Sequence, residues 1–365
     1  MKIGILSSGG DAPGINSAIR AATLEAEELG FELFGLKRGW DGLINFDEIQ
    51  LTEKMVDDIG EKAGTILRTS RTNPFSKKEG NKDGSRIVID NLKIHNYDAL
   101  IAIGGEDTLG VAYKIDQLWP HVVGIPKTID GDLQTYSIGY NTAIDKAKKC
   151  IVDFKTTASS HERVFVVEVM GRKTGHIAYK AGIAAGADVI LIPEIPYDIN
   201  VVFEAVKSVY EKRKKNDSNP YAMIVVAEGA MPIGKQKETY ISEETDEFGH
   251  KKLGGVSDRI ASQIKEKLGY DTRPLPLTYI PRSGETGCYD CFMGETLGRG
   301  VIHVIKEERH GVAIVDINGN LIKIMPLEEI IKPKTVDLKQ ISLYEKEVNF
   351  GRPSQNYKPK IKMIN

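Results

Sequence analysis

The chain has 365 residues, of which 49 are lysine or arginine and 51 are aspartate or glutamate, so its formal net charge is −2. This balance argues against a broad basic surface for nucleic acid or an anionic membrane, and no apolar run approaches the ~20 residues that span a bilayer. The first residues are typical of a strand rather than a signal peptide, and three cysteines are too few for a disulfide framework. We therefore expect a cytoplasmic globular protein of one large or two modest domains, without nucleic-acid or membrane partners.

Short apolar runs alternate with longer amphipathic segments along the chain. The first run, Ile3–Leu6, leads through Ser-Ser-Gly-Gly into a helix predicted over Gly14–Leu29. Further strands are predicted at Phe34–Leu36, Ala99–Ile103, Val122–Ile125, Val164–Val169, Val189–Ile192, Met223–Ala227, Leu275–Ile280 and Val312–Val315. Strands separated by helix-length segments are typical of βαβ units, so the sequence predicts an α/β fold with mostly parallel sheets. In such sheets, ligands bind at the carboxyl ends of the strands.

Two lobes are expected, one of them discontinuous. We place residues 1–138 and about 253–305 in one lobe, and residues 139–252 in the other. Residues 306–365 are predicted to form a C-terminal extension, since Lys332–Asn365 is rich in lysine and has little periodicity. The polar segment Ser76–Ser85 is expected to be a loop.

Two glycine motifs follow predicted strands. The segment Ser7–Asn16 (SSGGDAPGIN) places a glycine turn before a helix, which leaves backbone N–H groups free to hold phosphate oxygens. A plain tight turn between strand and helix is the alternative. The segment Gly104–Thr108 (GGEDT) adds two carboxylates that suit a Mg²⁺ ion held between protein and phosphate, with an acidic helix N-cap as the alternative. A Gly-Gly-acid segment at this position resembles that of several kinase superfamilies, including NAD and lipid kinases, and this resemblance implies phosphoryl transfer without specifying the acceptor.

The third motif, Pro126–Asp132 (PKTIDGD), also follows a predicted strand. Its carboxylates Asp130 and Asp132 can divide two tasks, because one can accept a proton from an attacking hydroxyl while the other holds a metal ion. Lys127 offers a positive charge to a phosphate. As an isolated surface turn Asp-Gly-Asp would be unremarkable, but a third motif at a strand end favours a catalytic site.

The order GGDAPGIN, GGEDT, PKTIDGD and SSHERVFVVEVMGR (Ser159–Arg172) resembles the 6-phosphofructokinase family over residues 1 to about 305. The resemblance implies a two-lobed, three-layer αβα fold of Rossmann type. It implies that residues 1–138 and about 253–305 form the phosphoryl-donor and catalytic lobe, and that residues 139–252 form the sugar-phosphate lobe. It also implies phosphoryl transfer to the 1-hydroxyl of fructose 6-phosphate, with Mg²⁺ as cofactor. Members of the family form homodimers or homotetramers that share sugar sites across an interface, so a homo-oligomer is expected.

The resemblance also implies roles for individual residues. Asp130 resembles the base that takes the proton from the sugar hydroxyl, Arg172 stabilises the transferring group, and Glu106 and Asp132 hold the metal ion. Around the phosphoryl donor it implies Gly10, Arg71, Asp107, Thr108 and Lys127, of which Lys127 is also expected to be catalytic. Around the sugar phosphate it implies Thr128, Asp130, Arg163, Met170, Gly171, Arg172, Glu228, Arg273, Tyr279 and Arg282. Of these, Arg163, Arg273 and Arg282 resemble the arginines that bind the 6-phosphate, and the first two are reached from a neighbouring subunit in the family.

One departure from the ATP-using members predicts pyrophosphate as the donor. Those enzymes usually have glycine where this chain has Asp107, which leaves room for the α-phosphate of the nucleotide. A carboxylate there would fill that space and repel the α-phosphate, whereas pyrophosphate has no third phosphate. Lys127 also stands where bacterial ATP enzymes have glycine, but some ATP-using relatives carry this lysine too, so the prediction depends on Asp107. We therefore expect reversible transfer from pyrophosphate, with an ATP-dependent 6-phosphofructokinase as the alternative.

Other functions fit the motifs less well. An NAD or lipid kinase would not need the PKTIDGD motif or the Met170–Arg172 segment, and an inactive sugar-binding subunit would lack the base or a metal carboxylate.

Trp40 lies where nucleotide-using relatives place a ring near adenine, although core packing explains it equally well. Cys288 and Cys291 lack a second pair or a nearby histidine, so no zinc or redox role is expected. Weak or no nucleotide effector control is expected, because the basic residues at Lys155 and Lys212–Lys215 do not match the family's effector pattern.

Overall fold

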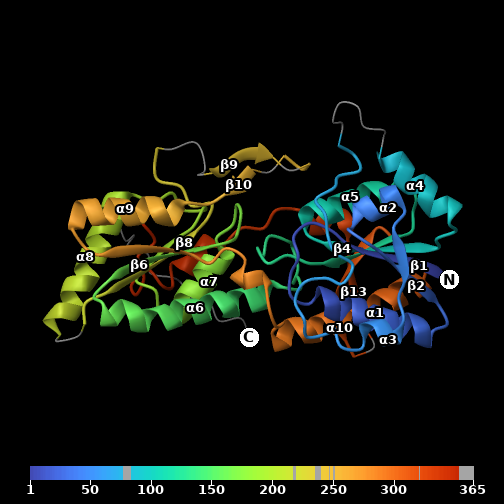
Figure 1. The fold of residues 1–365 in the computed structure, drawn as a ribbon, viewed down its shortest axis with the longest axis horizontal. Coiled ribbons are helices and arrows are strands. Elements are labelled where there is room, and N and C mark those ends of the chain that lie inside the picture. The colour runs from blue at the N-terminus through green and yellow to red at the C-terminus, as the bar shows by residue number, and fades with distance from the viewer. Residues whose placement is uncertain are drawn as a thin grey trace. The chain divides into compact units, whose positions relative to one another are not determined.

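The computed structural model describes residues 1–76, 84–216, 219–234, 240–245, 247–249, 251–319 and 321–352. The chain folds into two compact α/β units, each with its own sheet (Figure 1). Unit 1 comprises Met1–Ala143, Thr245–His250 and Arg282–Lys334, and unit 2 comprises Ile144–Glu244, Lys251–Pro281 and Thr335–Asn365, as far as these residues are described. Among the described residues, no helix combines the length and the apolar character needed to cross a membrane.

The sheet of unit 1 has seven strands in the order β13-β12-β5-β4-β1-β2-β3. These are β1 (Lys2–Ser7), β2 (Glu32–Leu36), β3 (Glu48–Gln50), β4 (Ala99–Gly104), β5 (Val122–Pro126), β12 (Val312–Asn318) and β13 (Leu321–Pro326). Strands β12, β5, β4, β1 and β2 are parallel neighbours, whereas β3 and β13 pair antiparallel at the two edges. Strands β4 and β5 are buried along their whole length, as expected of apolar runs in a parallel sheet covered on both faces.

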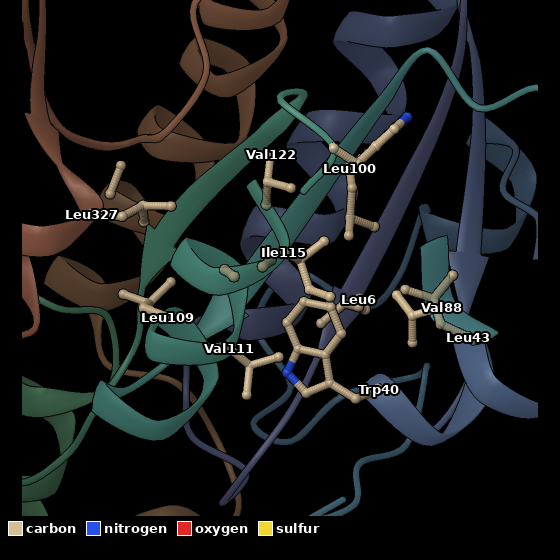
Figure 2. Packing of buried hydrophobic residues seen from close by; sticks show 14 of the residues in the cluster. Leu6, Trp40, Leu43, Val88, Leu100, Leu109, Val111, Ile115, Val122 and Leu327 are labelled. Atoms are coloured by element: carbon tan, nitrogen blue, oxygen red, sulfur yellow. The ribbon is translucent and has the colours of Figure 1, made fainter. Parts of the chain in front are cut away.

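Helices cover both faces of this sheet. They are α1 (Ile15–Glu28), α2 (Trp40–Asn45), α3 (Glu53–Val56), α4 (Gly84–Ile94), α5 (Glu106–Asp116), α10 (Cys288–Lys306) and α11 (Leu327–Ile330). In Figure 1, α2, α4 and α5 lie on one side of the strands and α1 and α10 on the other. Under the first group Trp40 is fully buried in a core shared with Leu6 and Ile115 (Figure 2). On the other face α1 and α10 approach so closely that a Cβ atom on Gly298 would lie 2.3 Å from the carbonyl oxygen of Ala18.

The sheet of unit 2 is parallel and has the order β11-β6-β8-β7. Its strands are β6 (Val164–Val169), β7 (Val189–Leu191), β8 (Ala222–Ala227) and β11 (Thr272–Pro276), and its helices are α6 (Tyr140–Ser160), α7 (His176–Ala185), α8 (Ile199–Lys215), α9 (Val256–Leu268) and α12 (Leu338–Ile341). The first turn of α6 belongs to unit 1. Helices α8 and α9 share one buried core with the sheet. Strands β9 (Tyr240–Thr245) and β10 (Lys251–Leu253) pair with each other.

The segment after residue 335 extends the edge of the second sheet. The N–H of Ile190 donates to the carbonyl of Asn349 (2.9 Å), and the N–H of Asn349 donates to the carbonyl of Asp188 (3.1 Å). Because β7 is an edge strand, this segment occupies backbone groups that would otherwise be open to pairing with another chain.

The α/β class and the mostly parallel sheets predicted from the sequence are confirmed. The units divide the chain differently from the predicted lobes. Residues 253–281 belong to unit 2, because β11 pairs with β6. Residues 306–334 belong to unit 1, because β12 extends its sheet beside β5, so part of the predicted extension lies within the first sheet.

Two local predictions, a strand after residue 275 and a loop after residue 76, have different outcomes. The predicted strand Leu275–Ile280 ends early, since β11 stops at Pro276 and Ile280 begins the 3₁₀ turn η1 (Ile280–Arg282). A proline has no N–H for a sheet ladder, which suits the edge position of β11. The predicted loop Ser76–Ser85 lies largely outside the described residues.

Candidate active site

The loop after β1 carries the first glycine motif. Gly9 has a φ of 81° and Gly14 a φ of 90°, which glycine adopts without steric cost. The N–H of Gly9 donates to the carbonyl of Ser70 (2.9 Å), and the hydroxyl of Thr69 donates to the carbonyl of Gly9 (2.7 Å). The N–H of Gly14 donates to the hydroxyl of Thr286 (3.3 Å). The amides of Gly9 and Gly14 are therefore bonded within the protein, and the role of Gly10 in donor binding stays a prediction.

Lys127 follows β5 and reaches this loop with its ammonium group. The residue is only 4% exposed, and Nζ donates to the carbonyl of Ser8 (3.2 Å) and to the carbonyl of Gly10. The pKa of Lys127 is lowered to about 8, chiefly by burial and then by the positive charge of Arg282. The other charges that act on this pKa are those of Asp11, Asp130 and Arg71. A buried cation therefore stands beside the glycine turn.

The second motif forms the end of β4 and the first turn of α5. Glu106 is exposed, Asp107 is half-buried, and Thr108 is 1% exposed. A Cβ atom on Gly104 would lie 2.2 Å from Cβ of Thr108, so only glycine allows this helix to start so close to the strand. Oγ1 of Thr108 lies 3.4 Å from the position that a Cβ on Gly9 would occupy, so the second motif meets the first. The N-cap residue of α5 is Gly105, which has no side chain that could cap the helix.

The third motif forms a tight loop after β5. The N–H of Asp130 donates to Oγ1 of Thr128 (3.0 Å), and the hydroxyl of Ser137 donates to the carbonyl of Thr128 (3.0 Å). Gly131, between the two carboxylates, has a φ of 73°, which lets the chain turn between them. Asp130 is 6% exposed. This loop therefore holds a nearly buried carboxylate in the same unit as Lys127 and Thr108.

The residues present fit a magnesium ion bound jointly by protein and phosphate. Oδ1 of Asp132 is buried and, among the described residues, has no hydrogen-bond partner. The described residues hold no group of three or more metal-ligating side chains, so they form no all-protein cage. Mg²⁺ is commonly bound through one or two carboxylates together with substrate phosphates, as Asp132 and Glu106 would allow.

In unit 2, a second set of predicted residues gathers at the carboxyl ends of β6 and β8. The half-buried Met170, with Gly171 and Arg172, follows β6, and Glu228 follows β8, the strand beside it. Oε1 of Glu228 accepts the N–H of Arg172 (2.9 Å) and, more weakly, that of Gly171 (3.3 Å). Arg172 has a φ of 50°, and a Cβ on Gly229 would lie 2.1 Å from its carbonyl oxygen. This turn is thus tightly constrained.

Arg163 and Arg273 lie at the other end of the same sheet. Arg163 immediately precedes β6, and Arg273 is the second residue of β11. Both bind Asp271: Nε of Arg163 lies 2.6 Å from Oδ2 and Nη2 of Arg273 lies 3.1 Å from Oδ1. Donation from Arg163 lowers the pKa of Asp271. Because β6 has six residues, about 20 Å separates these arginines from the Met170–Arg172 turn within unit 2.

The remaining predicted sugar residues follow β11. Tyr279 belongs to unit 2, where its side chain is 58% exposed. Arg282 belongs to unit 1, and its guanidinium atoms lie 2.9–3.0 Å from the position that a Cβ on Gly10 would occupy. The sugar-phosphate role that the resemblance implies for Arg282 stays a prediction. In the structure its guanidinium lies against Gly10, in the loop predicted for the phosphoryl donor.

Asp290 lies in the first turn of α10, and its contacts were not predicted from the sequence. Its side chain is fully buried and accepts four hydrogen bonds. Oδ2 accepts from the N–H and the hydroxyl of Thr142 (both 2.6 Å), and Oδ1 accepts from the N–H of Gly139 (2.9 Å) and the hydroxyl of Tyr136. Burial and the adjacent Asp290 carboxylate raise the pKa of Tyr136. Asp290 thus fixes the segment that runs from the third motif into α6.

The residues considered above for adenine contact, effector control and metal or redox roles have the following surroundings in the structure. Trp40 is 0% exposed in the core of unit 1, which leaves no ring surface for stacking on a nucleotide base. Nζ of Lys155 donates to the carbonyl of Gly186 (2.8 Å) at the end of α7. Arg213 binds both carboxylate oxygens of Asp188 (2.9 and 3.0 Å). Cys288 and Cys291 are free thiols.

The sequence profile described as "Phosphofructokinase" matches residues 2–305 of the chain. The chain belongs to the phosphofructokinase family. This membership confirms the resemblance carried by the glycine and acidic motifs. Among solved structures, a phosphofructokinase of Pichia pastoris in the T-state has a TM-score of 0.75 at 26% identity and covers 95% of this chain and 36% of that chain. A pyrophosphate-dependent phosphofructokinase of Nitrosospira multiformis, with a TM-score of 0.78 at 20% identity over 98% of this chain and 95% of that chain, shows the same fold.

Curated phosphofructokinases similar to this chain differ in their phosphoryl donor. A pyrophosphate–fructose 6-phosphate 1-phosphotransferase of Dictyoglomus thermophilum is 41% identical over 342 residues, which cover 92% of this chain and 95% of the relative. An ATP-dependent 6-phosphofructokinase 2 of Clostridium perfringens is 39% identical over 350 residues, which cover 92% of this chain and 93% of the relative. Because the two identities are so similar, they do not decide the donor.

Proposed function

We propose that the protein transfers a phosphoryl group reversibly from pyrophosphate to the 1-hydroxyl of fructose 6-phosphate. The products are fructose 1,6-bisphosphate and inorganic phosphate. The observation that carries the choice of donor is Asp107, a carboxylate in the first turn of α5 beside Thr108, which faces the β1 loop. Its charge opposes an α-phosphate at this position, and pyrophosphate has none.

In the proposed reaction Asp130 takes the proton from the sugar hydroxyl as its oxygen attacks phosphorus. The bond from this phosphorus to the bridging oxygen breaks, and inorganic phosphate leaves. Lys127 and Arg71 hold the donor phosphates, and Arg172 stabilises charge on the transferring group. Glu106 and Asp132 hold Mg²⁺, which neutralises phosphate charge when it is bound. Thr128, Met170, Gly171 and Glu228 contact the sugar.

The proposed sugar site also needs a neighbouring subunit. Arg163 and Arg273 lie at the amino end of the unit 2 sheet, about 20 Å from the Met170–Arg172 turn. They therefore do not serve the same sugar phosphate as that turn within one chain. We assign both arginines to the 6-phosphate bound by a second copy, which makes the active protein a homodimer or a homotetramer.

ATP is the second candidate donor because an ATP-dependent relative is nearly as similar. Steady-state rates with each donor, at saturating fructose 6-phosphate and Mg²⁺, distinguish the two. We expect strong preference for pyrophosphate and measurable reverse reaction from fructose 1,6-bisphosphate and phosphate. The Asp107→Gly variant should gain ATP activity, because the substitution removes the charge and the bulk beside the α-phosphate. Equal efficiency of the wild type with ATP and pyrophosphate would make Asp107 irrelevant to donor choice.

A further inference from the structure

The main chain of Asp132, the second carboxylate of the third motif, is bound by a segment far along the chain. The N–H of Lys334 donates to the carbonyl of Asp132 (3.0 Å). Two positions further along the loop, the N–H of Gln134 donates to the carbonyl of Ile330 (3.3 Å). The loop and the 330–334 segment therefore lie side by side and run in opposite directions, and both belong to unit 1.

The side chain of Gln134 adds to this contact. Its Nε2 atom donates to the carbonyls of Lys332 (3.2 Å) and Pro333 (3.0 Å). Leu133, the residue before Gln134, and Ile330 are both fully buried in the same core of unit 1. Apolar packing and hydrogen bonds from three donor atoms therefore hold the two stretches together.

Asp132 depends on this contact because a glycine separates it from Asp130. Gly131 has a φ of 73°, and a residue without a side chain allows a wide range of backbone conformations. The N–H of Asp130 donates to Oγ1 of Thr128 (3.0 Å), which fixes the loop before the glycine. After the glycine, the N–H of Lys334 holds the backbone. The two carboxylates are thus positioned by separate contacts.

The carboxylate of Asp132 is suited to a metal ion whose geometry is strict. Its Oδ1 atom is buried and has no hydrogen-bond partner among the described residues. Mg²⁺ demands near-octahedral coordination at about 2.0–2.1 Å, so a small displacement of a ligating oxygen weakens binding. Groups that only hold the ligands in place commonly change metal affinity or activity roughly 10- to 100-fold.

We propose that the N–H of Lys334 and the side chain of Gln134 position Asp132 for Mg²⁺ binding. This assignment rests on the proposed function, in which Asp132 and Glu106 hold the metal ion. It extends that function to Lys334, which lies beyond residues 2–305 that the family profile matches. Lys334 and Gln134 are positioning residues, since they act through the backbone of the loop and not on the ion.

The Mg²⁺ dependence of the Lys334→Pro variant tests the assignment. Proline removes the N–H that binds Asp132, whereas the matched control Lys334→Ala removes the same exposed side chain and keeps the N–H. In Lys334→Pro the Mg²⁺ concentration for half-maximal activity should rise about 5- to 10-fold. The KM for fructose 6-phosphate at saturating Mg²⁺ should stay close to that of the wild type. Lys334→Ala should match the wild type in both quantities. A merely structural role would lower the melting temperature without this selective change.

Metal binding can also be measured without turnover. Electron paramagnetic resonance of Mn²⁺, which prefers the same oxygen ligands as Mg²⁺, gives the free and bound ion in the presence of inorganic phosphate. The Kd for Mn²⁺ should rise about 5- to 10-fold in Lys334→Pro and stay unchanged in Lys334→Ala. Equal Kd values for a folded Lys334→Pro variant and the wild type would overturn the proposal.

The Asp132→Asn variant separates this proposal from the proposed function. If it binds Mn²⁺ as tightly as the wild type, Asp132 is not a metal ligand, and the proposed metal site fails together with its positioning. If it binds Mn²⁺ weakly while Lys334→Pro binds like the wild type, only the positioning role fails. This measurement does not involve the phosphoryl donor, so it holds equally if the wild type uses ATP.

A second variant tests the proposal if Lys334→Pro does not fold by thermal melting. Gln134→Met keeps the length of an exposed side chain and removes the hydrogen bonds to Lys332 and Pro333. It should raise the Kd for Mn²⁺ about 2- to 5-fold, because the N–H of Lys334 remains. An unchanged Kd in this variant would refute the role of Gln134 and of the segment that it binds.

Discussion

Arg172 has a φ of 50°, a left-handed conformation that is uncommon for a residue with a side chain. Such a conformation costs on the order of 1 kcal/mol or more and persists only where the surroundings impose it. Glu228 imposes it here, because its carboxylate accepts the N–H of Arg172 at 2.9 Å. The carbonyl oxygen of Arg172 also approaches Gly229, where a Cβ would lie 2.1 Å away. Residues that the sequence assigns to the sugar site thus constrain one another directly.

The assignment of Asp130 as the base predicts a specific defect. Asp130→Asn keeps the size of a side chain that is 6% exposed, so we expect the fold and the binding of fructose 6-phosphate to persist. The variant cannot accept the proton, and kcat should fall by roughly 10²–10⁴. Stopped-assay rates, thermal melting and sugar binding by calorimetry measure the three quantities. Near-normal turnover would remove Asp130 from the mechanism.

At the scale of elements, the sequence predicted individual strands and motifs better than the long-range contacts between them. The apolar runs at Ala99–Ile103 and Val122–Ile125 form β4 and β5, because a buried parallel strand needs a continuous apolar run. The three motifs at strand ends were likewise visible, since each is contiguous in the chain. The contacts of Asp290 were not, because Thr142 lies 148 positions away and no local pattern encodes such a pairing. The position of Arg282 against Gly10 was missed for the same reason.

Asp290 links α10 to the start of α6, and its replacement should loosen the third motif. In Asp290→Asn an NH₂ group replaces one acceptor oxygen, so the N–H of Gly139 or of Thr142 loses its partner inside the protein. Each buried donor left unpaired costs about 1–3 kcal/mol, which should lower the melting temperature by several degrees. We also expect a lower kcat with little change in the KM for the donor, because Asp130 is displaced while Lys127 stays in place.

Tyr136→Phe is the matched control for this variant, since it removes one of the four donors and keeps the carboxylate. It should lower both the melting temperature and kcat much less than Asp290→Asn does. Equal kcat values for Asp290→Asn and the wild type, measured well below the melting temperature, would reduce Asp290 to a purely structural residue.

At the scale of the whole molecule, the parallel sheets determine which residues one chain can bring together. The carboxyl ends of β1, β4 and β5 carry the glycine and acidic motifs in unit 1, and those of β6 and β8 carry Arg172 and Glu228 in unit 2. This follows the general placement of ligand sites in such sheets. Arg163 and Arg273 depart from it, because they lie at the amino end of β6 and β11. The sugar-binding role proposed for them therefore predicts an oligomer.

Subunit mixing tests this requirement. Asp130→Asn should be inactive for lack of a base, and Arg273→Ala should be nearly inactive at low fructose 6-phosphate because its neighbour's sugar site lacks a cation. In a hybrid dimer of the two variants, one of the two sites has an intact base and an intact arginine. A 1:1 mixture whose subunits exchange should therefore regain about a quarter of the wild-type activity for a dimer with isologous sites.

The same mixing experiment needs a measure of subunit exchange, because variants whose subunits do not exchange regain no activity. Light scattering gives the assembly size, and differently tagged subunits that copurify show that hybrids have formed. As a control, Asp130→Asn mixed with Asp132→Asn should stay inactive, since both residues lie in the same loop of one chain and no hybrid site contains both intact. Hybrids that form without regaining activity, or a fully active monomer at assay concentration, would show that Arg273 does not act in the site of a neighbouring subunit.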